Sequence, residues 1–295
     1  MNILIIGATG FIGSALCKQL QDDGITVYGC GRKKKEEIQH SLLFMNDYWS
    51  MQDGDVPNTF WCNANMVILL AAKRPYTGFN MADYHANVAL VSKYLDESVS
   101  HGVDRFILTS SKSVYSGKGM PWRESQYCAP SSLYGASKQA GEQLGMYYNL
   151  TGKIAFVSLR LAQVIGVGEK QRNLIKVLMN NAANKNPQTI YGNGQQKRQY
   201  VYIRDVCRAF IEVIRCPRVD GLFNIGMPRS YTNLEVAETV NDVFQNTGNI
   251  ILRTDIPERG NSDEMNIKKA EEKLGFKAIW DLRSSINDMK DSLDA

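Results

Sequence analysis

The fold is decided by one stretch near the N-terminus, Ile3-Leu4-Ile5-Ile6-Gly7-Ala8-Thr9-Gly10-Phe11-Ile12-Gly13. Its first four residues are apolar without alternation, which is typical of a strand buried on both faces of a parallel sheet. Three glycines then recur at every third position, and residues 12–22 have the periodicity of an amphipathic helix. A strand, a glycine turn and a helix in this order predict the first βαβ unit of a dinucleotide-binding fold.

The glycines of this turn each have a physical role. Gly7 permits a sharp turn, Gly10 lets backbone amides approach a pyrophosphate at the helix N-terminus, and Gly13 allows the helix to pack closely on the sheet. The spacing is G-x-x-G-x-x-G and differs from the usual G-x-G-x-x-G, but its position directly after a strand supports the assignment. The predicted dinucleotide contacts from this turn are Gly7, Thr9, Gly10, Phe11, Ile12 and Gly13.

Apolar runs alternate with amphipathic stretches through the first half of the chain. Strands are predicted over Ile3–Ile6, Thr26–Gly29, Met66–Ala71, Phe106–Ser110 and Ala155–Leu161, and helices over 12–22, 86–100 and 134–149. This alternation predicts an α/β fold, a Rossmann-type doubly wound parallel sheet with helices on both faces.

The pattern changes after Gly166. Helices are expected over 172–185, 206–215, 233–244 and 267–274, and strands over 200–203 and 222–225. We therefore expect a dinucleotide-binding domain over residues 1–165, to which 198–226 returns, and a smaller C-terminal substrate-binding cap formed by 166–197 and 227–295.

Composition argues against several classes of protein. The 34 basic and 30 acidic residues give a formal net charge of +4 over 295 residues, which is too small to indicate a nucleic-acid partner. The six cysteines include no C-x-x-C pair and only three histidines are present, so we expect reduced thiols and no metal site. No apolar run reaches about 18 residues and the N-terminus lacks a basic segment, so we expect no membrane span, no secretion signal and a cytoplasmic location.

The end of the second strand bears on the choice of cofactor. In an NAD site an acidic residue there accepts hydrogen bonds from the ribose hydroxyls, whereas a basic residue accommodates the 2′-phosphate of NADP. Here the strand leads into Gly31-Arg32-Lys33, with no carboxylate. Arg32 placed against the adenosine ribose favours NADP(H), and the alternative is a solvated basic loop. Asp47, after the expected third strand, is a candidate acceptor for the adenine amino group or an ordinary loop residue.

A second motif supplies groups for proton transfer. Tyr134 and Lys138 stand four residues apart at the start of a predicted helix, so both side chains lie on one face. A nearby ammonium favours phenolate and lowers the pKa of the tyrosine towards working pH. Upstream, the strand that ends in Thr109-Ser110-Ser111 brings hydroxyls to the carboxyl edge of the sheet, where open α/β sheets bind ligands. This combination indicates an active site rather than a chance pair.

Along nearly its whole length the chain resembles the extended short-chain dehydrogenase/reductase family, also called the NAD-dependent epimerase/dehydratase family, in its nucleotide-sugar-modifying branch. The matching segments are the glycine turn, Leu70-Ala71-Ala72, Asn87, the Ser-Ser-x-x-Val-Tyr stretch from Ser110 to Tyr115, the Tyr134 and Lys138 pair, Leu159-Arg160, and Arg198-Gln199-Tyr200-Val201-Tyr202-Ile203-Arg204-Asp205. The resemblance implies that Ser111 is the catalytic hydroxyl, that Tyr134 is the acid and base, and that Lys138 binds the nicotinamide ribose and tunes the tyrosine. It also implies cofactor contacts from Leu70, Ala71, Ala72 and Asn87.

Two departures from the family pattern carry information. Members that dehydrate sugars have an Asp-Glu pair after the catalytic hydroxyl, whereas this chain has Lys112 and Ser113, so elimination of water is not expected. After Leu159-Arg160 the family often has Pro and Asn, and here Gln163 is the candidate to take over the substrate contact.

The resemblance also implies a nucleoside diphosphate sugar as substrate. Two cap arginines, Arg198 and Arg259, would hold the diphosphate with paired hydrogen bonds. Tyr191 resembles the residue that stacks on the base, and Asn173 a phosphate or sugar contact. The substrate-binding residues expected on this basis are Ser111, Ser113, Gln163, Asn173, Tyr191, Arg198 and Arg259. Taken singly, each could equally be a surface arginine or a core aromatic residue.

Two reactions at C4 of the hexose share all of these residues. A 4-keto-sugar reductase uses NADPH once, whereas a 4-epimerase of the UDP-glucose or UDP-N-acetylglucosamine type keeps NAD bound. The lack of an acidic ribose ligand favours the reductase, with NADP preferred to NAD. A non-catalytic dinucleotide-sensing protein on the same fold is the alternative of another class, and the presence of Ser111, Tyr134 and Lys138 argues against it. We also expect a homodimer.

Overall fold

The computed structural model describes residues 1–75, 78–116, 118–258 and 260–293. Its centre is a seven-stranded sheet in the order β11-β6-β5-β4-β1-β2-β3, with every neighbouring pair parallel. The strands are β1 (Asn2–Ile6), β2 (Thr26–Gly31), β3 (Asp47–Ser50), β4 (Met66–Leu69), β5 (Arg105–Ser111), β6 (Ala155–Leu161) and β11 (Gly221–Ile225). The strand order reverses between β1 and β4, which is the switch point where such sheets bind ligands. The predicted Rossmann-type fold is confirmed.

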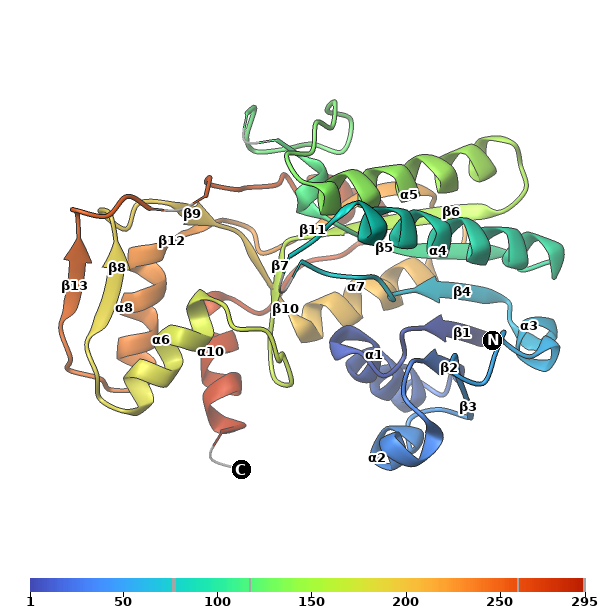
Figure 1. Ribbon diagram of the computed structural model, residues 1–295, viewed down its shortest axis with the longest axis horizontal. Coiled ribbons are helices and arrows are strands. Elements are labelled where there is room, and N and C mark those ends of the chain that lie inside the picture. The colour runs from blue at the N-terminus through green and yellow to red at the C-terminus, as the bar shows by residue number, and fades with distance from the viewer. Residues whose placement is uncertain (76–77, 117, 259, 294–295) are drawn as a thin grey trace.

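Helices cover both faces of this sheet (Figure 1). On one face α1 (Phe11–Asp22) packs against α7 (Ile203–Arg215), and on the other α4 (Met81–Ser100) packs against α5 (Leu133–Leu150). Ile3 and Ile5 of β1 belong to the apolar cluster that includes α1 and α7, whereas Leu4 and Ile6 belong to the cluster that includes α4. Because β1 is buried on both sides, its residues are apolar without alternation. The shorter helices of this half are η1 (Lys35–Ile38), α2 (Gln39–Leu42), α3 (Asn58–Asn63), η2 (Lys112–Val114) and α9 (Lys268–Leu274).

Other segments from the second half of the chain form a smaller unit beside the sheet, on the left of Figure 1. Helices α6 (Leu174–Ala183), α8 (Asn233–Val243) and α10 (Leu282–Asp291) enclose an apolar core of their own. Strand β8 (Gln188–Tyr191) pairs in parallel with β13 (Ile250–Arg253), and β9 (Lys197–Arg198) pairs antiparallel with β12 (Tyr231–Thr232). At the junction, β7 (Gln163–Ile165) pairs in parallel with β10 (Tyr200–Tyr202).

Several boundaries differ from the sequence-based expectation. Helix α4 begins at Met81 rather than 86, because Asn80 caps it: the Asn80 side chain accepts from the Asp83 amide at 3.1 Å and the Asp83 carboxylate accepts from the Asn80 amide. Helix α6 begins at Leu174 rather than 172, because Asn173 caps it in the same position. Helix α7 begins at Ile203, directly after β10, and not at 206.

Other elements were not predicted at all. They are η1, α2, α3, η2, α10 and the short strands β7, β8, β9, β12 and β13, most of which have too few residues to show a period. Within the segment 198–226, β11 joins the central sheet and α7 packs on α1, whereas β9 and β10 pair outside that sheet. Among the described residues, no helix has both the length and the apolarity to cross a membrane.

Candidate active site

The glycine turn lies against the ends of three strands. Gly7 has φ of +99°, and a Cβ there would lie 2.7 Å from the amide nitrogen of Ala71 at the end of β4. The amides of Gly7 and Ala8 both donate to the carbonyl of Cys30 in β2, at 2.8 and 3.0 Å. A Cβ on Gly13 would lie 2.2 Å from the Gly7 carbonyl oxygen, so α1 starts in close contact with the turn. Only glycine fits at these two positions.

The first turn of α1 is open to an anion. Gly10 stands at the N-cap, so it has no side chain to accept from the free amides of the helix, and no acidic residue lies in the first turn. Phe11 and Ile12 are half-buried and pack against the core of the smaller unit, while Thr9 lies beside Gly31 at the end of β2. The turn therefore presents its backbone amides, and not its side chains, at the switch point of the sheet.

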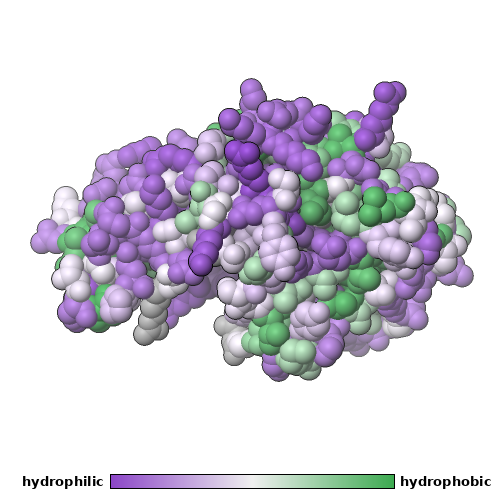
Figure 2. Space-filling view, turned by 90° about the horizontal axis from the view of Figure 1, so that it is seen from above, coloured by the Kyte–Doolittle hydropathy of each residue, from purple (hydrophilic) through white to green (hydrophobic). Residues whose placement is uncertain are grey.

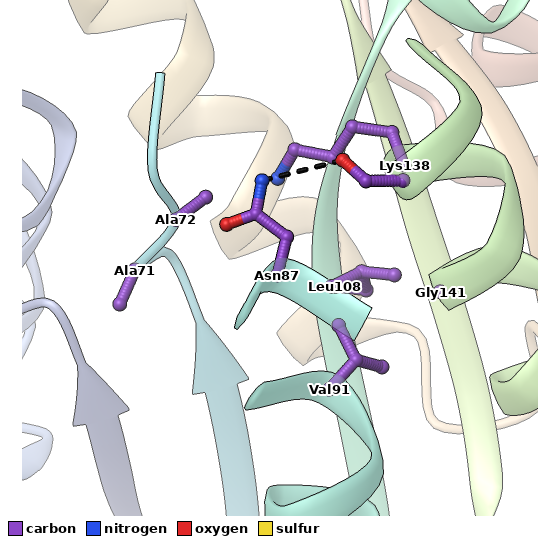
Figure 3. Close-up of a pocket in the computed structure, with 8 residues that line it drawn as sticks. Ala71, Ala72, Asn87, Val91, Leu108, Lys138 and Gly141 are labelled. Atoms are coloured by element: carbon purple, nitrogen blue, oxygen red, sulfur yellow. Dashed lines mark hydrogen bonds between the residues drawn. The ribbon is translucent and has the colours of Figure 1, made fainter. Parts of the chain in front are cut away.

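A small pocket continues from the turn towards α5. It is lined by Ala71 and Ala72 after β4, by Asn87 and Val91 of α4, and by Leu108, Ser137, Lys138 and Gly141. Figure 3 shows the side chains of Asn87 and Lys138 pointing toward one another, with Ala71 and Ala72 on the segment to their left. Leu70 precedes this group, and its amide donates to the Ile6 carbonyl at 2.9 Å.

Asn87 connects the three walls of that pocket. Its side-chain oxygen accepts from the Lys73 amide at 2.7 Å, and its nitrogen donates to the Lys73 carbonyl at 3.0 Å and to Ser137 Oγ at 3.2 Å. Ser137 Oγ in turn donates to the Tyr134 carbonyl at 2.8 Å. Asn87 thus holds the loop after β4 against the first turn of α5, which carries the predicted catalytic tyrosine.

The predicted catalytic residues meet at the carboxyl end of β5. Ser111 ends that strand, and its Oγ lies 3.1 Å from Ser113 Oγ and accepts from the Ser113 amide. Tyr134 and Lys138 lie in the first two turns of α5, with Lys138 Nζ 5.8 Å from the centre of the Tyr134 ring. Lys138 Nζ also donates to the Thr109 carbonyl of β5 at 2.8 Å. The strand end and the helix start are therefore held together by the lysine itself.

Burial lowers the pKa of Lys138. The side chain is 7% exposed, and desolvation, with a smaller effect of the Arg74 charge, lowers the pKa of Lys138 to about 8, while Glu142 acts in the opposite direction. A lysine with this pKa changes its charge close to neutral pH. It can therefore modulate the proton affinity of the neighbouring phenol.

The backbone at the start of α5 lies unusually close to the backbone of η2, and this contact was not predicted from the sequence. A Cβ on Gly135 would lie 2.0 Å from the Ser113 carbonyl oxygen. The start of α5 can therefore lie directly on η2 only because residue 135 is glycine. The signal was present, since a glycine stood directly after Tyr134 in a predicted helix, where glycine is unfavourable.

A buried ion pair crosses from this site to the smaller unit. Lys112, directly after Ser111, pairs with Asp263, whose side chain is 8% exposed and also accepts from the Gln199 amide at 2.8 Å. Burial lowers the pKa of Lys112, Asp263 opposes that shift, and the nearby charge of Arg198 adds to it. Lys112, the first of the two residues that stand in place of an acidic pair, is therefore anchored beside Arg198.

Apart from Ser111 and Ser113, the predicted substrate residues with a described position lie on the smaller unit and at the junction. Arg198 is in β9, and its guanidinium donates to Gln196 at 3.1 Å. Tyr191 ends β8 and is 51% exposed. Asn173 caps α6 through its side-chain oxygen, which accepts from Lys176 at 3.0 Å, and Gln163 begins β7. Arg259 lies outside the described residues.

The two residues predicted for the adenosine end of the cofactor have different outcomes. Arg32 follows β2 directly and is exposed, and its contact with the ribose stays a prediction. Asp47 was wrongly placed, because it begins β3 instead of following it and pairs with Tyr28 in the middle of β2. Its carboxylate forms an exposed ion pair with Lys35 at 3.1 Å. The chain enters the sheet at Asp47 because the preceding Asn46 side chain accepts from the Val27 amide at 2.8 Å.

Neither disulfides nor metal clusters occur in the described part of the chain. All six cysteines are free, and no group of His, Cys, Asp and Glu side chains there has an arrangement that could hold a metal ion.

Comparisons with known proteins extend these observations over the whole chain. The sequence model of the NAD dependent epimerase/dehydratase family matches residues 3–226. The chain is 26% identical over 303 residues to YtcB of Bacillus subtilis, an uncharacterized UDP-glucose epimerase, covering 97% of this chain and 96% of the relative. It is 25% identical over 316 residues to dTDP-4-dehydro-6-deoxyglucose reductase of Escherichia coli, covering 99% and 97%. The crystal structure of UDP-N-acetylglucosamine 4-epimerase from Bacillus cereus superposes with a TM-score of 0.87 at 25% identity and covers 100% of both chains.

Proposed function

Because the chain belongs to the NAD dependent epimerase/dehydratase family, we propose that it catalyses an oxidation or reduction at C4 of a nucleoside diphosphate hexose. Membership confirms the resemblance inferred from the motifs and the assignment to enzymes that use a nicotinamide dinucleotide. The reaction at C4, the nucleotide sugar and the form of the cofactor are the parts that we propose.

The residues of the glycine turn fit a dinucleotide. Gly7 and Gly13 leave no room for side chains, and the uncapped first turn of α1 offers amides to a pyrophosphate. Lys138 and Asn87 lie beyond the turn, beside the carboxyl end of β5, and would face the ribose at the nicotinamide end of the dinucleotide. When bound, the dinucleotide supplies a hydride donor or acceptor at its nicotinamide ring.

Tyr134 and Ser111 would act on the oxygen at C4. In a reduction the Tyr134 phenol donates a proton to that oxygen, and in an oxidation the phenolate removes it. The Lys138 ammonium near the Tyr134 ring stabilises the phenolate. Ser111, at the end of β5, would donate a hydrogen bond to the same oxygen and so hold C4 beside the phenol.

The smaller unit would hold the nucleotide. Arg198 is the guanidinium proposed for the diphosphate, with Arg259 as the second, and exposed Tyr191 is the surface on which a base would stack. Gln163, Asn173 and Ser113 remain proposed sugar or phosphate contacts. Since the Lys112 and Asp263 pair connects the end of β5 to the segment beside Arg198, the sugar would span the distance between Ser111 and Arg198 next to this pair.

The end of β2 supports a 4-keto-sugar reductase that uses NADPH. Gly31 ends the strand, and a Cβ there would lie 2.7 Å from Thr9 Oγ1 and 2.8 Å from the Tyr48 hydroxyl oxygen, so an acidic side chain does not fit without a shift. The next residue, Arg32, is exposed and would bind the 2′-phosphate. This is the observation that carries the choice of reductase.

A second candidate is a nucleotide-sugar 4-epimerase with bound NAD. It is favoured by the solved structure that matches all of this chain, a UDP-N-acetylglucosamine 4-epimerase, and by the UDP-glucose epimerase relative. The catalytic residues would be the same in both reactions.

A homodimer and a cytoplasmic location remain predictions. The outer surfaces of α4 and α5 carry exposed apolar side chains, namely Met81, Leu133, Tyr147 and Leu150. Figure 2 shows most of the apolar patches on the half of the molecule that contains these helices, whereas the other half is largely hydrophilic.

The proposed function is tested by two measurements. Oxidation of NADPH or NADH is followed with a nucleoside diphosphate 4-keto-hexose, and interconversion of nucleoside diphosphate hexoses is followed by NMR without added cofactor. We expect Tyr134→Phe to reduce kcat by about 10²–10⁴ in whichever assay is active, because the proton donor is lost. Tyr147→Phe on the same helix, where the side chain is 57% exposed, is the matched control and keeps full activity.

Each outcome of these assays has a different meaning. Activity only in the NMR assay selects the epimerase over the reductase. Near-normal turnover by Tyr134→Phe contradicts the assignment of the acid and base. A protein that binds the dinucleotide but is inactive in both assays supports a sensing role instead.

A further inference from the structure

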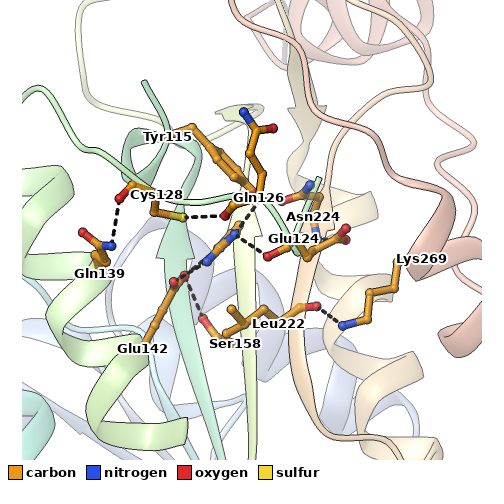
Figure 4. A network of polar contacts seen from close by, with 11 residues as sticks. Tyr115, Glu124, Gln126, Cys128, Gln139, Glu142, Ser158, Leu222, Asn224 and Lys269 are labelled. Atoms are coloured by element: carbon orange, nitrogen blue, oxygen red, sulfur yellow. Dashed lines mark hydrogen bonds and ion pairs between the residues drawn. The ribbon is translucent and has the colours of Figure 1, made fainter. Parts of the chain in front are cut away.

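A fully buried ion pair lies beneath the active-site helix. Arg160 of β6 donates to Glu142 of α5 with both ends of its fork, Nε to Oε1 at 2.9 Å and one terminal nitrogen to Oε2 at 2.7 Å. The two side chains are 2% and 0% exposed. Figure 4 shows Glu142 reaching from α5 towards Ser158, with Tyr115 and Glu124 on the other side of the network.

Glu142 belongs to the same helix face as the proposed catalytic pair. Tyr134, Lys138 and Glu142 follow each other at intervals of four residues in α5, so their side chains stack along one face. Tyr134 stands at the cleft end of this row and Glu142 at the buried end. Lys138, in the middle, has the phenol on one side and the carboxylate on the other.

Few charged or titratable groups act on Lys138. Its own helix contributes Tyr134 and Glu142, and the loop after β4 contributes Arg74, whose charge lowers the pKa of Lys138. The neighbours from α4 and β5 are Asn87 and Thr109, which carry no charge. Glu142 is the acidic group among them, and it raises the pKa of Lys138 against the effect of burial.

The carboxylate can act in this way because Arg160 supplies its counter-charge and fixes its position. An isolated carboxyl group in a buried position would take up a proton, whereas a two-pronged contact with a guanidinium stabilises the anion. The guanidinium is in turn held by the Tyr115 hydroxyl at 2.6 Å. Glu142 therefore remains a fixed negative charge about one helical turn from Lys138.

We propose that Glu142, oriented by Arg160, is a positioning residue that keeps Lys138 charged at the pH at which the enzyme works. This inference rests on the proposed function, because Lys138 must be an ammonium to stabilise the Tyr134 phenolate. It assigns a role in proton transfer to a pair that does not touch the cleft.

A structural role alone predicts a different result. If the pair only joined α5 to β6, its removal would change stability and leave the ionisation of Lys138 unaltered. Under the proposal, loss of the Glu142 charge moves the ionisation of Lys138 to lower pH. The decisive measurement is therefore the titration of Lys138 itself and not the activity alone.

The test uses the full chain with ¹³C-labelled lysine. The Lys138 resonance is assigned by its absence in Lys138→Arg, and its titration is followed by NMR between pH 6 and 10 in wild type, Glu142→Gln and the double variant Glu142→Gln/Arg160→Met. We expect a wild-type midpoint at about 8. The midpoint is expected to fall by roughly one unit or more in Glu142→Gln, as a charge at this separation acts in a medium of effective dielectric near 20. The double variant also removes the positive charge of Arg160, which opposes that of Glu142, so its midpoint should shift in the same direction but by less.

The double variant provides a second measurement in case Glu142→Gln does not fold. Glu142→Gln alone leaves a buried guanidinium without its counter-charge, whereas removing both charges of such a pair is often tolerated. Asp205→Asn, which breaks a buried carboxylate contact to Arg208 on α7 far from this helix face, is the matched control and should leave the midpoint unchanged.

In an active enzyme the same variants should narrow the pH profile of kcat/KM. The limb that requires Lys138 charged moves to lower pH. A Lys138 midpoint within about 0.3 unit of wild type in both Glu142 variants would overturn the proposal, whatever the activity. Failure of the proposed function is seen separately: the Glu142 variants shift the Lys138 midpoint as expected, but the wild-type protein neither reduces nor epimerises a nucleotide sugar.

Discussion

A methyl group at residue 135 should separate the two halves of the proposed active site. In Gly135→Ala the new Cβ would lie 2.0 Å from the Ser113 carbonyl oxygen and 2.9 Å from Pro130 Cβ. A carbon and an oxygen in ordinary contact need about 3.3 Å, so η2 and the start of α5 must move apart by roughly 1 Å. Because the obstacle is backbone, no side-chain rotation can relieve it.

The magnitude follows from that displacement. Overpacking of this kind costs about 1–3 kcal/mol of stability, partly offset by up to about 1 kcal/mol from the better helix propensity of alanine. A misplacement of 1 Å between reacting groups can reduce the rate by about 10². We therefore expect kcat to fall on the order of 100-fold, with only a small change in Tm.

The control is a second glycine of the same helix. In Gly145→Ala the new Cβ would lie 2.0 Å from the ring of Phe156, far from Tyr134 along α5. That variant should lose stability by a similar amount and keep its kcat, since the catalytic residues stay in place. Both variants are compared by thermal unfolding and by the kcat assay at a temperature where both are folded. Wild-type kcat in Gly135→Ala, or equal loss of kcat in the two variants, would refute this reasoning.

Three further substitutions test the choice of cofactor, the binding of the substrate and the ion pair between Lys112 and Asp263. Arg32→Asp should reverse a preference for NADPH over NADH and weaken NADPH binding by about 1.5–3 kcal/mol. If the wild-type protein does not bind NADPH in a titration, Arg32 belongs only to a solvated loop. Arg198→Ala should raise KM for a nucleotide sugar by roughly 10-fold or more while leaving dinucleotide affinity unchanged, and an unaltered KM would argue against a diphosphate at this arginine. Lys112→Met should destabilise the protein by about 3–5 kcal/mol in chemical denaturation, because Asp263 is left as an unpaired buried carboxylate. The double variant Lys112→Met/Asp263→Asn should recover most of that loss. If the double variant is no more stable than the single one, the ion pair is not the cause of the lost stability.

Local spacing made some features of the site predictable. Gly7, Gly10 and Gly13, the Tyr134 and Lys138 pair and the hydroxyls at the end of β5 each occupy positions within one short segment, so their relative placement follows from strand and helix geometry. Even the early start of α4 had a local signal, since Asn80 and Asp83 have the spacing of a capping pair. Asp47 was misplaced because its strand has four residues, too few to show a period.

Contacts between distant segments were not predictable in this way. Lys112 and Asp263 lie in different halves of the chain, and nothing near either residue in the sequence indicates that they pair. The same holds for Glu142 and Arg160, although both stand next to recognisable motifs. Such pairs depend on the path of the whole chain, since two charges become partners only when folding removes both from water.

The sequence by itself therefore determined the sheet, the dinucleotide turn and the identity of the proposed proton donor, because these depend on residue type and on spacing within a few residues. Only the tertiary structure decided how closely α5 approaches η2 at Gly135, which cation faces Asp263, and which charges surround Lys138. The physical reason is that the pKa of a buried lysine depends on desolvation and on charges a few ångströms away, and both arise only when separate segments pack together.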